Sequence, residues 1–364
     1  MNKWYFEINI KRILRLIRSI FISTYNILRY GYNEVDILSY KRKKYADTII
    51  LNEYQNTDAY YGISAILRKY SGYRKIITAT IEHGVYFGTV TSEVEEYNLP
   101  CVITFSDERK KELRKVTDRP IFVIGPYILY ANSILKSDEL NKIKADLGTT
   151  LLVVPSHGLE KIHKEYSQDL LIEYVISVSK EYKIDTVLVS LYFADIERYA
   201  KYYERMGWRI VCSGYRTDTN FLNRQRTIME ISDYVITNNV GTHIGYAVAL
   251  NKPVSFFKQD IVTKALDGET VKHLDPFEGT PLSERNKNEI IDAFNGFHTQ
   301  ITDIQYNVID KYWGLSKHRT PEEIKSVFET LDKIWKTSRE LNYKEDFLRI
   351  IELGKNIKVP NLLD

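Results

Sequence analysis

Apolar, β-branched runs alternate with stretches of helical periodicity along most of the chain, beginning near residue 46. The runs expected to form strands are, in order, 47–51, 75–80, 101–105, 120–124, 149–154, 186–190, 209–212, 234–237 and 254–257. Helices are expected at about 59–70, 107–116, 168–182, 194–206, 220–231 and 242–250. Strands separated by helices of about ten residues are usually joined by right-handed crossovers. The pattern therefore predicts an α/β fold built on parallel sheets.

One interruption of this pattern predicts a domain boundary. The segment 125–148 is irregular and then helical, and it ends at Gly148, which suits a linker. We expect two Rossmann-like parallel-sheet domains that face a cleft, with this division of the chain: an arm over 1–45, domains over 46–147 and 148–320, and a helical tail over 321–364. The tail could pack back on the first domain or mediate association. Folds of this kind bind ligands beyond the carboxyl ends of their strands.

Length and composition agree with this organisation. The 364 residues exceed the roughly 250–300 residues at which single cores stop growing, so two domains are expected. With 44% hydrophobic and 27% charged residues, the chain is typical of globular proteins, and disordered and collagen-like classes are excluded. The two cysteines, Cys101 and Cys212, lie in apolar runs, which favours buried reduced thiols of a cytosolic protein over a redox pair.

The net charge of +3 is unevenly distributed along the chain. Residues 1–45 contain ten Lys and Arg side chains against three Asp and Glu, a net charge of +7, so the rest of the chain carries −4. A nucleic-acid-binding protein would carry its basic charge over the folded body, with stacking aromatic residues between the charges. The distribution therefore argues against a nucleic-acid partner.

The basic arm has the pattern of an amphipathic helix. Its cations Lys11, Arg15, Arg18 and Arg29 share one side of a helical wheel, and isoleucine, leucine and phenylalanine side chains occupy the other. Two interpretations remain open. Residues 8–29 could lie on an anionic membrane surface, or the helix could pack on its own domain. The first predicts a cytoplasmic protein held peripherally on the inner face of the cytoplasmic membrane. The apolar stretch is too short for a span and lacks a signal-peptide core.

Three of the seven histidines follow the ends of predicted strands. The loops that carry them are Glu82-His83-Gly84, Ser156-His157-Gly158 and Asn238-Asn239-Val240-Gly241-Thr242-His243. The carboxyl ends of parallel strands share one edge of a sheet, so these loops are expected on the ligand side.

Each loop has a functional and a structural interpretation. At the start of a helix, Gly241 and Thr242 could bind a phosphate, or Thr242 could be a plain N-cap. In the first loop, Glu82 or His83 could be a general base, or the histidine could bond to the backbone of a turn. In the second, Ser156 and His157 could bond a phosphate or a leaving-group oxygen, or form a structural turn.

Several well-known site motifs are absent from the sequence. It has no Walker loop, dinucleotide fingerprint or Gly-x-Ser-x-Gly elbow. It also has no His-x-x-x-His, Cys-x-x-Cys or Asp-x-Asp spacing, so neither a metal nor a cofactor is expected.

Together, these features resemble the two-Rossmann (GT-B) glycosyltransferases. The likeness extends over about 46–320, and it is closer to bacterial enzymes of capsule and lipopolysaccharide assembly, a neighbourhood that includes sialyl-, Kdo- and polyol-phosphate transferases. Its most telling part is the segment 232–253, Ser-Asp-Tyr-Val-Ile-Thr-Asn-Asn-Val-Gly-Thr-His-Ile-Gly-Tyr-Ala-Val-Ala-Leu-Asn-Lys-Pro, which is similar to the strand and helix that bind the donor phosphate in that family.

The resemblance implies a role for each loop. Gly241 and Thr242 would hold the donor phosphates, Ser156 and His157 would face the leaving phosphate, and Glu82 and His83 would lie on the acceptor side. The implied catalytic residues are Glu82, His83 and His157, and the implied donor-binding residues are Ser156, Gly158, Arg216, Asn238, Asn239, Gly241, Thr242 and His243. Arg216 follows the strand at 209–212 and could line the nucleotide pocket or be a surface arginine.

The expected function is that of a metal-independent, inverting glycosyltransferase. It would move a sugar from a nucleotide-sugar donor to a polysaccharide or lipid-linked acceptor in capsule or lipopolysaccharide assembly. Helix dipole and hydrogen-bond donors such as His157 and His243 would stabilise the leaving phosphate. Two alternatives stay open: a polysaccharide pyruvyl- or polyol-phosphate transferase, and a non-catalytic sugar-nucleotide-binding or scaffold protein of a capsule complex.

Overall fold

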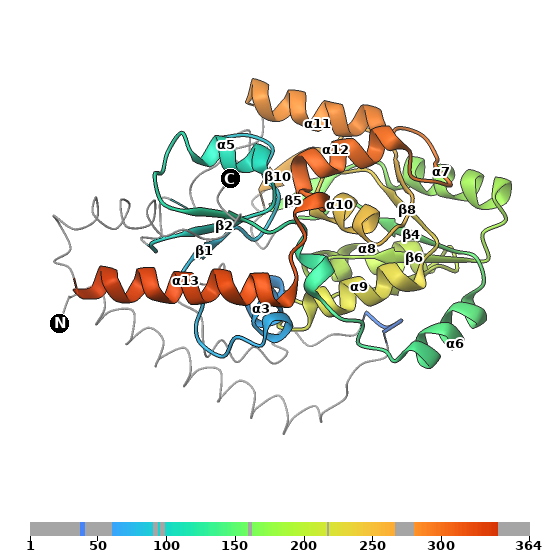
Figure 1. Ribbon diagram of the computed structural model, residues 1–364. Coiled ribbons are helices and arrows are strands. Elements are labelled where there is room, and N and C mark those ends of the chain that lie inside the picture. The colour runs from blue at the N-terminus through green and yellow to red at the C-terminus, as the bar shows by residue number, and fades with distance from the viewer. Residues whose placement is uncertain are drawn as a thin grey trace.

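A computed structural model gives the fold (Figure 1). The residues that it describes are 37–40, 60–89, 94, 99–158, 162–216, 218–265 and 280–340. The basic arm up to residue 36, the predicted strand at 47–51 and the end of the predicted tail lie outside the described residues.

The larger sheet has five parallel strands in the order β7-β6-β4-β8-β9. Its strands are β4 (Thr150–Val154), β6 (Thr186–Ser190), β7 (Arg209–Val211), β8 (Tyr234–Thr237) and β9 (Val254–Phe256). The chain proceeds from β4 to β6 and β7 on one side, then returns to β8 and β9 on the other. The strand order therefore reverses beside β4, and this switch point is where open α/β sheets bind ligands.

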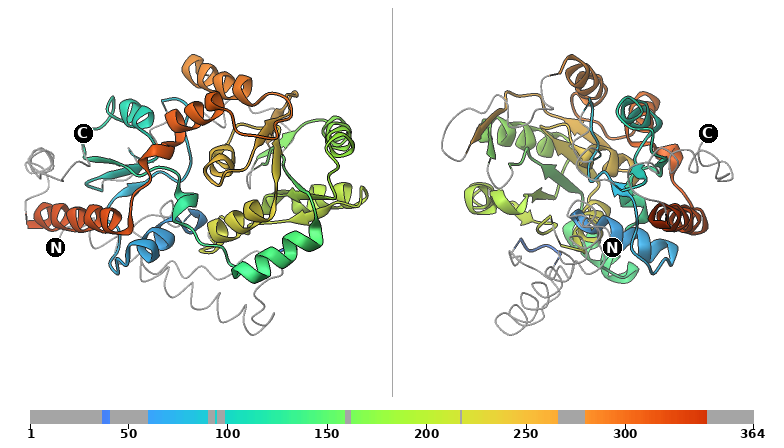
Figure 2. Two further views of the ribbon diagram at one scale, coloured as in Figure 1. Left: turned by 45° about the vertical axis from the view of Figure 1, so that its right-hand side comes forward. Right: turned by 90° about the vertical axis from the view of Figure 1, so that its left-hand side faces the viewer.

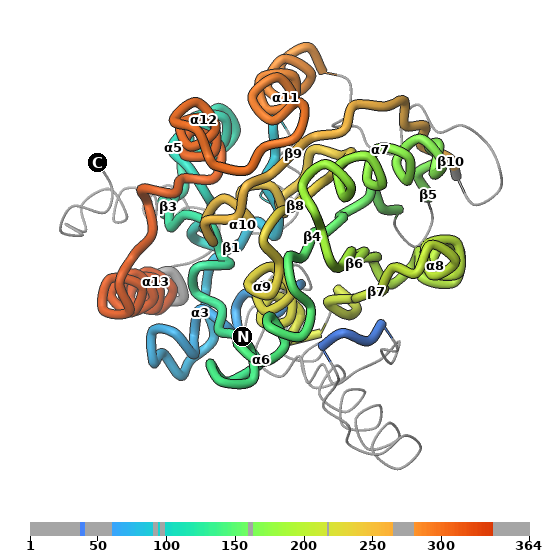
Figure 3. The backbone as a smooth tube through the Cα atoms, turned by 90° about the vertical axis from the view of Figure 1, so that its right-hand side faces the viewer, coloured from blue at the N-terminus to red at the C-terminus, as the bar shows by residue number. Residues whose placement is uncertain are grey.

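Helices cover both faces of this sheet, and successive residues of β4 point to opposite faces. On one face, Leu152 packs with α9 (Phe221–Ile231) and α10 (Thr242–Ala249). On the other, Leu151 and Val153 pack with α7 (Gln168–Glu181) and α8 (Ile196–Glu204). Figure 3 shows these three layers. A parallel sheet buried on both faces explains why its strands read as continuous apolar runs in the sequence.

The smaller sheet has three parallel strands in the order β1-β2-β3. They are β1 (Thr80–Ile81), β2 (Val102–Thr104) and β3 (Ile121–Val123). The run expected as a strand over 75–80 pairs only from Thr80 onward, so this prediction was wrong in extent. The residues just before this strand are also buried, namely Ile77, Thr78 and Ala79. The apolar run in the sequence therefore marks buried chain that extends beyond the paired strand.

The remaining elements connect and flank the sheets. The helices are α3 (Ile63–Ser71), α5 (Asp107–Leu113), α6 (Ser137–Leu147), α11 (Pro281–Phe294), α12 (Asp303–Trp313) and α13 (Pro321–Glu340). Short 3-10 turns are η1 (Tyr60–Gly62), η2 (Tyr127–Tyr130), η3 (Phe193–Asp195) and η4 (Leu315–Lys317). A small antiparallel pair is formed by β5 (Ile162–Glu165) and β10 (Val262–Ala265). The prediction of an α/β protein with parallel sheets is confirmed.

The end of the described chain returns to the smaller sheet. Helix α13 packs beside α3, as Figures 1 and 2 show. The Phe328 ring lies 5.3 Å from that of Tyr73, and the Tyr70 hydroxyl donates to the Arg319 carbonyl over 3.0 Å. We use "small-sheet region" for 60–123 together with α13, and "large-sheet region" for 137–313.

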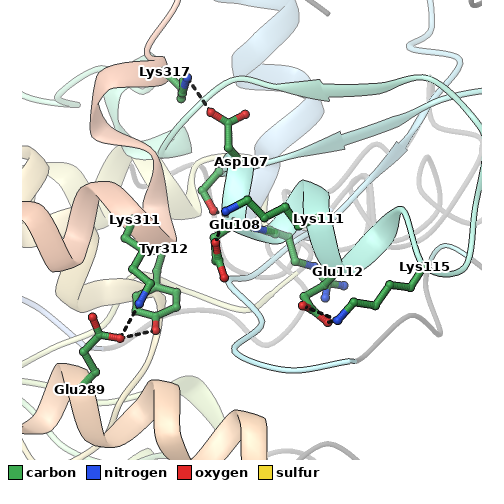
Figure 4. A network of polar contacts seen from close by, with 11 residues as sticks. Asp107, Glu108, Lys111, Glu112, Lys115, Glu289, Lys311, Tyr312 and Lys317 are labelled. Carbon is green, nitrogen blue, oxygen red and sulfur yellow. Dashed lines mark hydrogen bonds and ion pairs between the residues drawn. The ribbon is translucent and has the colours of Figure 1, made fainter. Parts of the chain in front are cut away.

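Polar contacts hold α12 and η4 to neighbouring helices (Figure 4). The Lys317 ammonium lies 2.6 Å from the Asp107 carboxylate at the start of α5. Lys311 and Tyr312 of α12 both donate to Glu289 of α11, each over 2.6 Å. Helix α12 is thus fixed to α11 on one side and, through η4, to the small-sheet region on the other.

Two glycines meet where the chain passes between the regions. Gly125 follows β3 and Gly314 follows α12, and both have positive φ angles, of 75° and 67°. A Cβ atom on Gly125 would lie 2.7 Å from the Gly314 carbonyl oxygen, and one on Gly314 would lie 2.3 Å from that of Phe105. Only glycine fits either position, because both the φ angle and the close approach exclude a side chain.

The two cysteines are buried thiols, as predicted. Burial raises the pKa of the Cys101 thiol. Among the described helices, none combines the length and the apolar character needed to cross a membrane.

Candidate functional site

A pocket of about 370 Å³ lies at the carboxyl ends of the strands, next to the switch point at β4. The small-sheet region contributes Tyr61 and the loop 83–88, and the large-sheet region contributes residues of the loops after β4, β6, β7 and β8 and of α9, α10 and α11. Of the predicted site residues, His83, His157, Asn239, Gly241, Thr242 and His243 line the pocket, whereas Glu82, Ser156, Gly158, Asn238 and Arg216 do not.

The start of α10 forms one wall of the pocket. Gly241 has an extended backbone and precedes the helix, and the Thr242 hydroxyl accepts the Val85 N–H over 3.2 Å. The Trp313 indole N–H donates to the Thr242 carbonyl over 3.0 Å, which fixes the first turn from behind. The first N–H groups of a helix have no intrahelical partner and sit at the positive end of its dipole. This wall therefore suits an anion.

His243 supports this helix start but supplies no positive charge. Its Nε2 lies 2.9 Å from the Thr237 hydroxyl at the end of β8. Burial, together with the nearby charge of His157, lowers the pKa of His243 to about 3. The ring is therefore neutral at physiological pH and can act only as a neutral hydrogen-bond donor.

The loops after β4 and β8 are tied together beneath the pocket, because their strands are neighbours in the sheet. The Asn238 side-chain oxygen accepts the Ser156 N–H over 2.6 Å. Asn238 and Ser156 are buried, and within the described part of the chain the Asn238 Nδ2 and the Ser156 Oγ have no hydrogen-bond partner. These two predicted donor-binding residues thus form the floor that positions the lining residues.

His157 faces the pocket from this floor with a defined tautomer. Its Nδ1 lies 2.9 Å from the Gly158 carbonyl, which can only accept, so Nδ1 carries a proton. Its ring lies 5.0 Å from that of Tyr192. The Gly158 N–H donates to the buried carboxylate of Asp195 over 2.9 Å. The pattern search missed Asp195, which comes from η3 after β6 and belongs to no motif.

Glu82 does not reach the pocket, which corrects its predicted place on the acceptor side. Only 1% of its side chain is exposed, and the Arg109 Nε donates to both carboxylate oxygens over 3.0 Å. The Thr104 hydroxyl donates to the same carboxylate over 2.6 Å. A general base must come within hydrogen-bond reach of the proton that it abstracts. Glu82 is instead held in the interior by Arg109, which also donates to the Gly88 carbonyl over 3.0 Å.

His83 is the residue of this loop that lines the pocket. Its imidazole lies among three tyrosine rings, with centroids 5.4 Å from Tyr60, 5.9 Å from Tyr61 and 6.1 Å from Tyr86. The loop is also bonded to the start of α10, because the Val85 N–H donates to the Thr242 hydroxyl. Of the two residues predicted as the base, His83 alone is placed to contact a bound molecule.

Arg216 supports the aromatic wall from outside the pocket. Its guanidinium lies 5.0 Å from the centre of the Tyr60 ring, and its carbonyl accepts the Tyr61 N–H over 2.5 Å. The predicted alternative, a direct contact with the nucleotide pocket, does not match this position.

Helix α11 adds residues that the sequence reasoning missed. Ser283 and Lys287 line the pocket, and the Asn286 side chain donates to the Phe87 carbonyl over 2.8 Å, which fixes α11 to the loop 83–88. No carboxylate lines the pocket within the described part of the chain, whereas Lys287 and two histidines other than His243 do. Elsewhere in the described residues, no group of three or more His, Cys, Asp or Glu could hold a metal ion.

Comparisons with known proteins give loose likenesses. No family model matches the sequence, and no curated protein matches it either. The chain is similar to a variant of the wall teichoic acid polymerase TagF, with 12% identity and a TM-score of 0.42 over 91% of this chain and 99% of that one. A second TagF structure matches at 14% identity and a TM-score of 0.32, over 74% of this chain and 60% of that one.

A glycosyltransferase from Rickettsia africae ESF-5 is also similar, with 18% identity and a TM-score of 0.28 over 80% of this chain and 73% of that one. At such identities and TM-scores the likeness concerns general architecture and no individual enzyme. Function has to be inferred from the pocket itself.

Proposed function

We propose that this protein is a glycosyltransferase that moves a sugar from a nucleotide-sugar donor to a polysaccharide or lipid-linked acceptor. The observation that carries the proposal is one pocket that holds an anion-binding helix start between two histidines from different sheets. Gly241 and Thr242 form the helix start, and His157 and His83 lie on the walls. Glycosyl transfer needs this combination: positive potential for the departing phosphate and a base for the acceptor hydroxyl.

Each group has a defined role in the proposed reaction. The donor phosphates bind the N–H groups at the start of α10 and the Thr242 hydroxyl, with His157 beside the leaving oxygen. His83 takes the proton of the acceptor hydroxyl as that oxygen attacks the sugar. The displacement is direct and inverting in this proposal: the acceptor oxygen bonds to the sugar as the bond to the leaving phosphate breaks.

The proposed reaction is independent of metal ions. The helix start, His157 and Lys287 supply the positive potential that a divalent ion would otherwise give to the departing phosphate. We expect full activity after treatment with EDTA and dialysis into metal-free buffer. A loss of activity that added Mg²⁺ or Mn²⁺ restores would overturn this part of the proposal.

The most informative test is a donor screen. Thermal-shift measurements with CMP, UDP, GDP and their sugar conjugates should give one nucleotide that raises the melting temperature. Incubation with that donor and acceptor glycans should then release the free nucleotide, and the H83Q variant should bind the donor without turnover. If H83Q retains full activity, His83 is not the base.

A second candidate, polyol-phosphate transfer, is favoured by the positive character of the pocket. In phosphoryl transfer, negative charge is spread over the oxygens of the transferred group. No described lining residue is a carboxylate that would repel these oxygens. The products separate the candidates: sugar transfer from a nucleoside diphosphate sugar releases the diphosphate, whereas polyol-phosphate transfer from a nucleoside diphosphate polyol releases the monophosphate. Inorganic phosphate from phosphoenolpyruvate would indicate pyruvyl transfer, and binding without turnover would indicate a scaffold.

We also propose that the protein acts in capsule or lipopolysaccharide assembly at the inner face of the cytoplasmic membrane. Support comes from the charge of residues 1–45 and the amphipathic pattern of 8–29, which lie outside the described residues apart from 37–40. Cations near an anionic leaflet each contribute on the order of 1 kcal/mol. Deletion of residues 1–30 should move the protein from the membrane to the soluble fraction, and unchanged partitioning would contradict this.

A further inference from the structure

Five side chains from η1, α9 and α10 form a part of the pocket lining that carries no charge. They are Tyr61 of η1, Phe221, Leu222 and Gln225 of α9, and Tyr246 of α10, and we call them the uncharged corner. The Tyr61 ring lies 4.7 Å from that of Phe221. Apolar and aromatic walls around a few polar groups suit a neutral ligand that has an apolar face.

The Tyr246 hydroxyl is the group of this corner that most needs a partner. The side chain is only 3% exposed, yet within the described part of the chain no hydrogen bond involves its hydroxyl. A buried phenol usually finds a hydrogen-bond partner, because leaving it unpaired costs the free energy of its desolvation. Burial raises the pKa of Tyr246, so the hydroxyl keeps its proton and can donate as well as accept. A molecule bound in the pocket would supply the missing partner.

The Gln225 side chain is the second polar group of the corner that makes no hydrogen bond to other described residues. Its amide can donate and accept at the same time. On α10, Tyr246 comes four residues after Thr242, so the two lie on one face of the helix, one turn apart. The uncharged corner therefore lies next to the anion-binding helix start but is distinct from it.

Tyr61 is held in this corner by an unusual backbone. Its φ angle is 59°, in the left-handed region that a bulky side chain rarely adopts. The Arg216 carbonyl accepts its N–H, and a Cβ atom on Gly62 would collide with the Thr219 backbone, so this turn is packed against the loop after β7. Such conformations persist where the surrounding contacts impose them, and they cluster at binding sites. The Tyr61 ring also lies 5.9 Å from that of His83, which places the corner beside the proposed base.

We propose that the uncharged corner binds one sugar unit of the acceptor, a neutral ring that carries hydroxyl groups. Tyr246 and Gln225 bond a hydroxyl other than the one that attacks, and the rings of Tyr61 and Phe221 contact the apolar face of the unit. The inference rests on the proposed function, because His83 as the base marks this side as the acceptor side. An acceptor without that hydroxyl leaves buried polar groups unpaired and binds more weakly, so Tyr246 and Gln225 determine specificity.

Saturation-transfer NMR with the full chain tests the proposal by binding alone. The probes are the methyl glycosides of glucose, galactose and mannose and their monodeoxy derivatives, at millimolar concentration. At least one parent glycoside should bind, and Y246F, which removes only the hydroxyl, should weaken its binding by about 3–10-fold. One deoxy derivative should bind the wild type as weakly and should not be affected by Y246F, because both changes remove the same hydrogen bond.

Tyr312 provides the matched control, since it is also 3% exposed but lies outside the pocket lining. Its hydroxyl donates to Glu289 over 2.6 Å, and Y312F should bind the probes as the wild type does. Q225A changes a less buried position and should weaken the same probe if Y246F fails to fold. The proposal is overturned if no parent glycoside binds, or if the folded variants of the corner bind every probe as tightly as the wild type.

The donor found in the nucleotide screen separates the two possible sources of the bound sugar. An acceptor unit should remain bound when the intact donor is added. Displacement by the intact donor, but not by the free nucleotide, would mean that the donor's own sugar occupies the corner, which would overturn the assignment. Sugar binding that depends on Tyr246 without any release of nucleotide would count against the proposed function and leave the binding site in place.

Discussion

Two histidine-glycine turns line the pocket, one after the first strand of each parallel sheet. They differ in the acidic residue that lies near each turn and in what that residue binds. Behind His83-Gly84, the acidic neighbour Glu82 is bound by Arg109 and the imidazole lies among tyrosine rings. Behind His157-Gly158, the acid is Asp195 from a separate loop, and it holds the turn through the backbone. The same dipeptide is thus placed in two electrostatic settings.

The comparison teaches that the surroundings of a histidine decide its chemistry more than its motif does. Near His83 the acidic neighbour Glu82 is bound by the Arg109 guanidinium, so the imidazole is the group of that turn that lines the pocket. Near His157 the acid Asp195 accepts the Gly158 N–H, and the Gly158 carbonyl accepts the imidazole Nδ1–H, so Nε2 is the nitrogen left to meet a ligand. A base and an electrophilic donor are the two roles that the proposed reaction requires on opposite sides of its substrate.

Replacing the two histidines should give the largest effects and should separate their roles. H83Q should lower kcat by about 10²–10⁴-fold, as loss of a general base does. H157Q should lower it by about 10²–10³-fold, as loss of one transition-state hydrogen-bond donor does. Steady-state kinetics with purified variants check both values. His298, which lies outside the pocket lining and bonds to the Asn295 carbonyl, gives the control H298Q with unchanged rates.

Breaking the buried ion pair between Glu82 and Arg109 should have the largest effect on stability. E82A leaves the Arg109 guanidinium buried without its carboxylate, which should cost about 3–5 kcal/mol in the free energy of unfolding. The exposed pair Glu112–Lys115 is the matched control, and E112A should cost less than about 1 kcal/mol. Urea unfolding compares the two variants, and equal losses would show that burial of the pair is energetically unimportant.

A smaller effect is expected from crowding the helix that stands between the two turns. A Cβ atom on Gly245 would lie 2.3 Å from atoms of the Trp313 ring, so G245A should destabilise the protein by about 1–3 kcal/mol. Because Trp313 also holds the Thr242 carbonyl, nucleotide binding should weaken in parallel. Calorimetry and thermal unfolding test this. The losses caused by G245A and W313A should not add up in the double variant G245A/W313A, because alanine at 313 removes the ring atoms that the methyl group would meet.

The effect spread over the widest range of conditions concerns pH and the neutral histidine His243. Folding lowers the pKa of His243 from 6.5 to about 3, so between these values the unfolded chain binds more protons than the folded one. Stability should therefore rise with pH across this window, by up to about 1.4 kcal/mol per pH unit from this group. Urea unfolding between pH 4 and 7 should show a shallower dependence in H243N. An unchanged slope would place the ring in a more polar setting.

The arrangement of the large sheet could be predicted from the sequence because its signals are local. Apolar runs marked β4, β6, β7, β8 and β9, and the Gly-Thr pair marked the start of α10. The histidines at strand ends followed from the same reasoning, because the carboxyl ends of parallel strands share one edge of a sheet.

The electrostatic partners could not be predicted in this way because they depend on contacts between distant segments. Arg109 lies 27 residues after Glu82 and Asp195 lies 37 residues after Gly158, and neither belongs to a recognisable motif. Lys287 comes from a helix outside both strand series. The sequence therefore indicated where a ligand would bind, whereas which acid serves which histidine required the tertiary structure.

The contact between Gly125 and Gly314 has a mechanical consequence. Two of the connections between the small-sheet and large-sheet regions pass each other at this point, with backbone against backbone and no side chain between them. A rotation that widened the pocket would have to turn both connections about this one crossing. Backbone angles at two tightly packed glycines would then set the range of that rotation, although neither glycine lines the pocket.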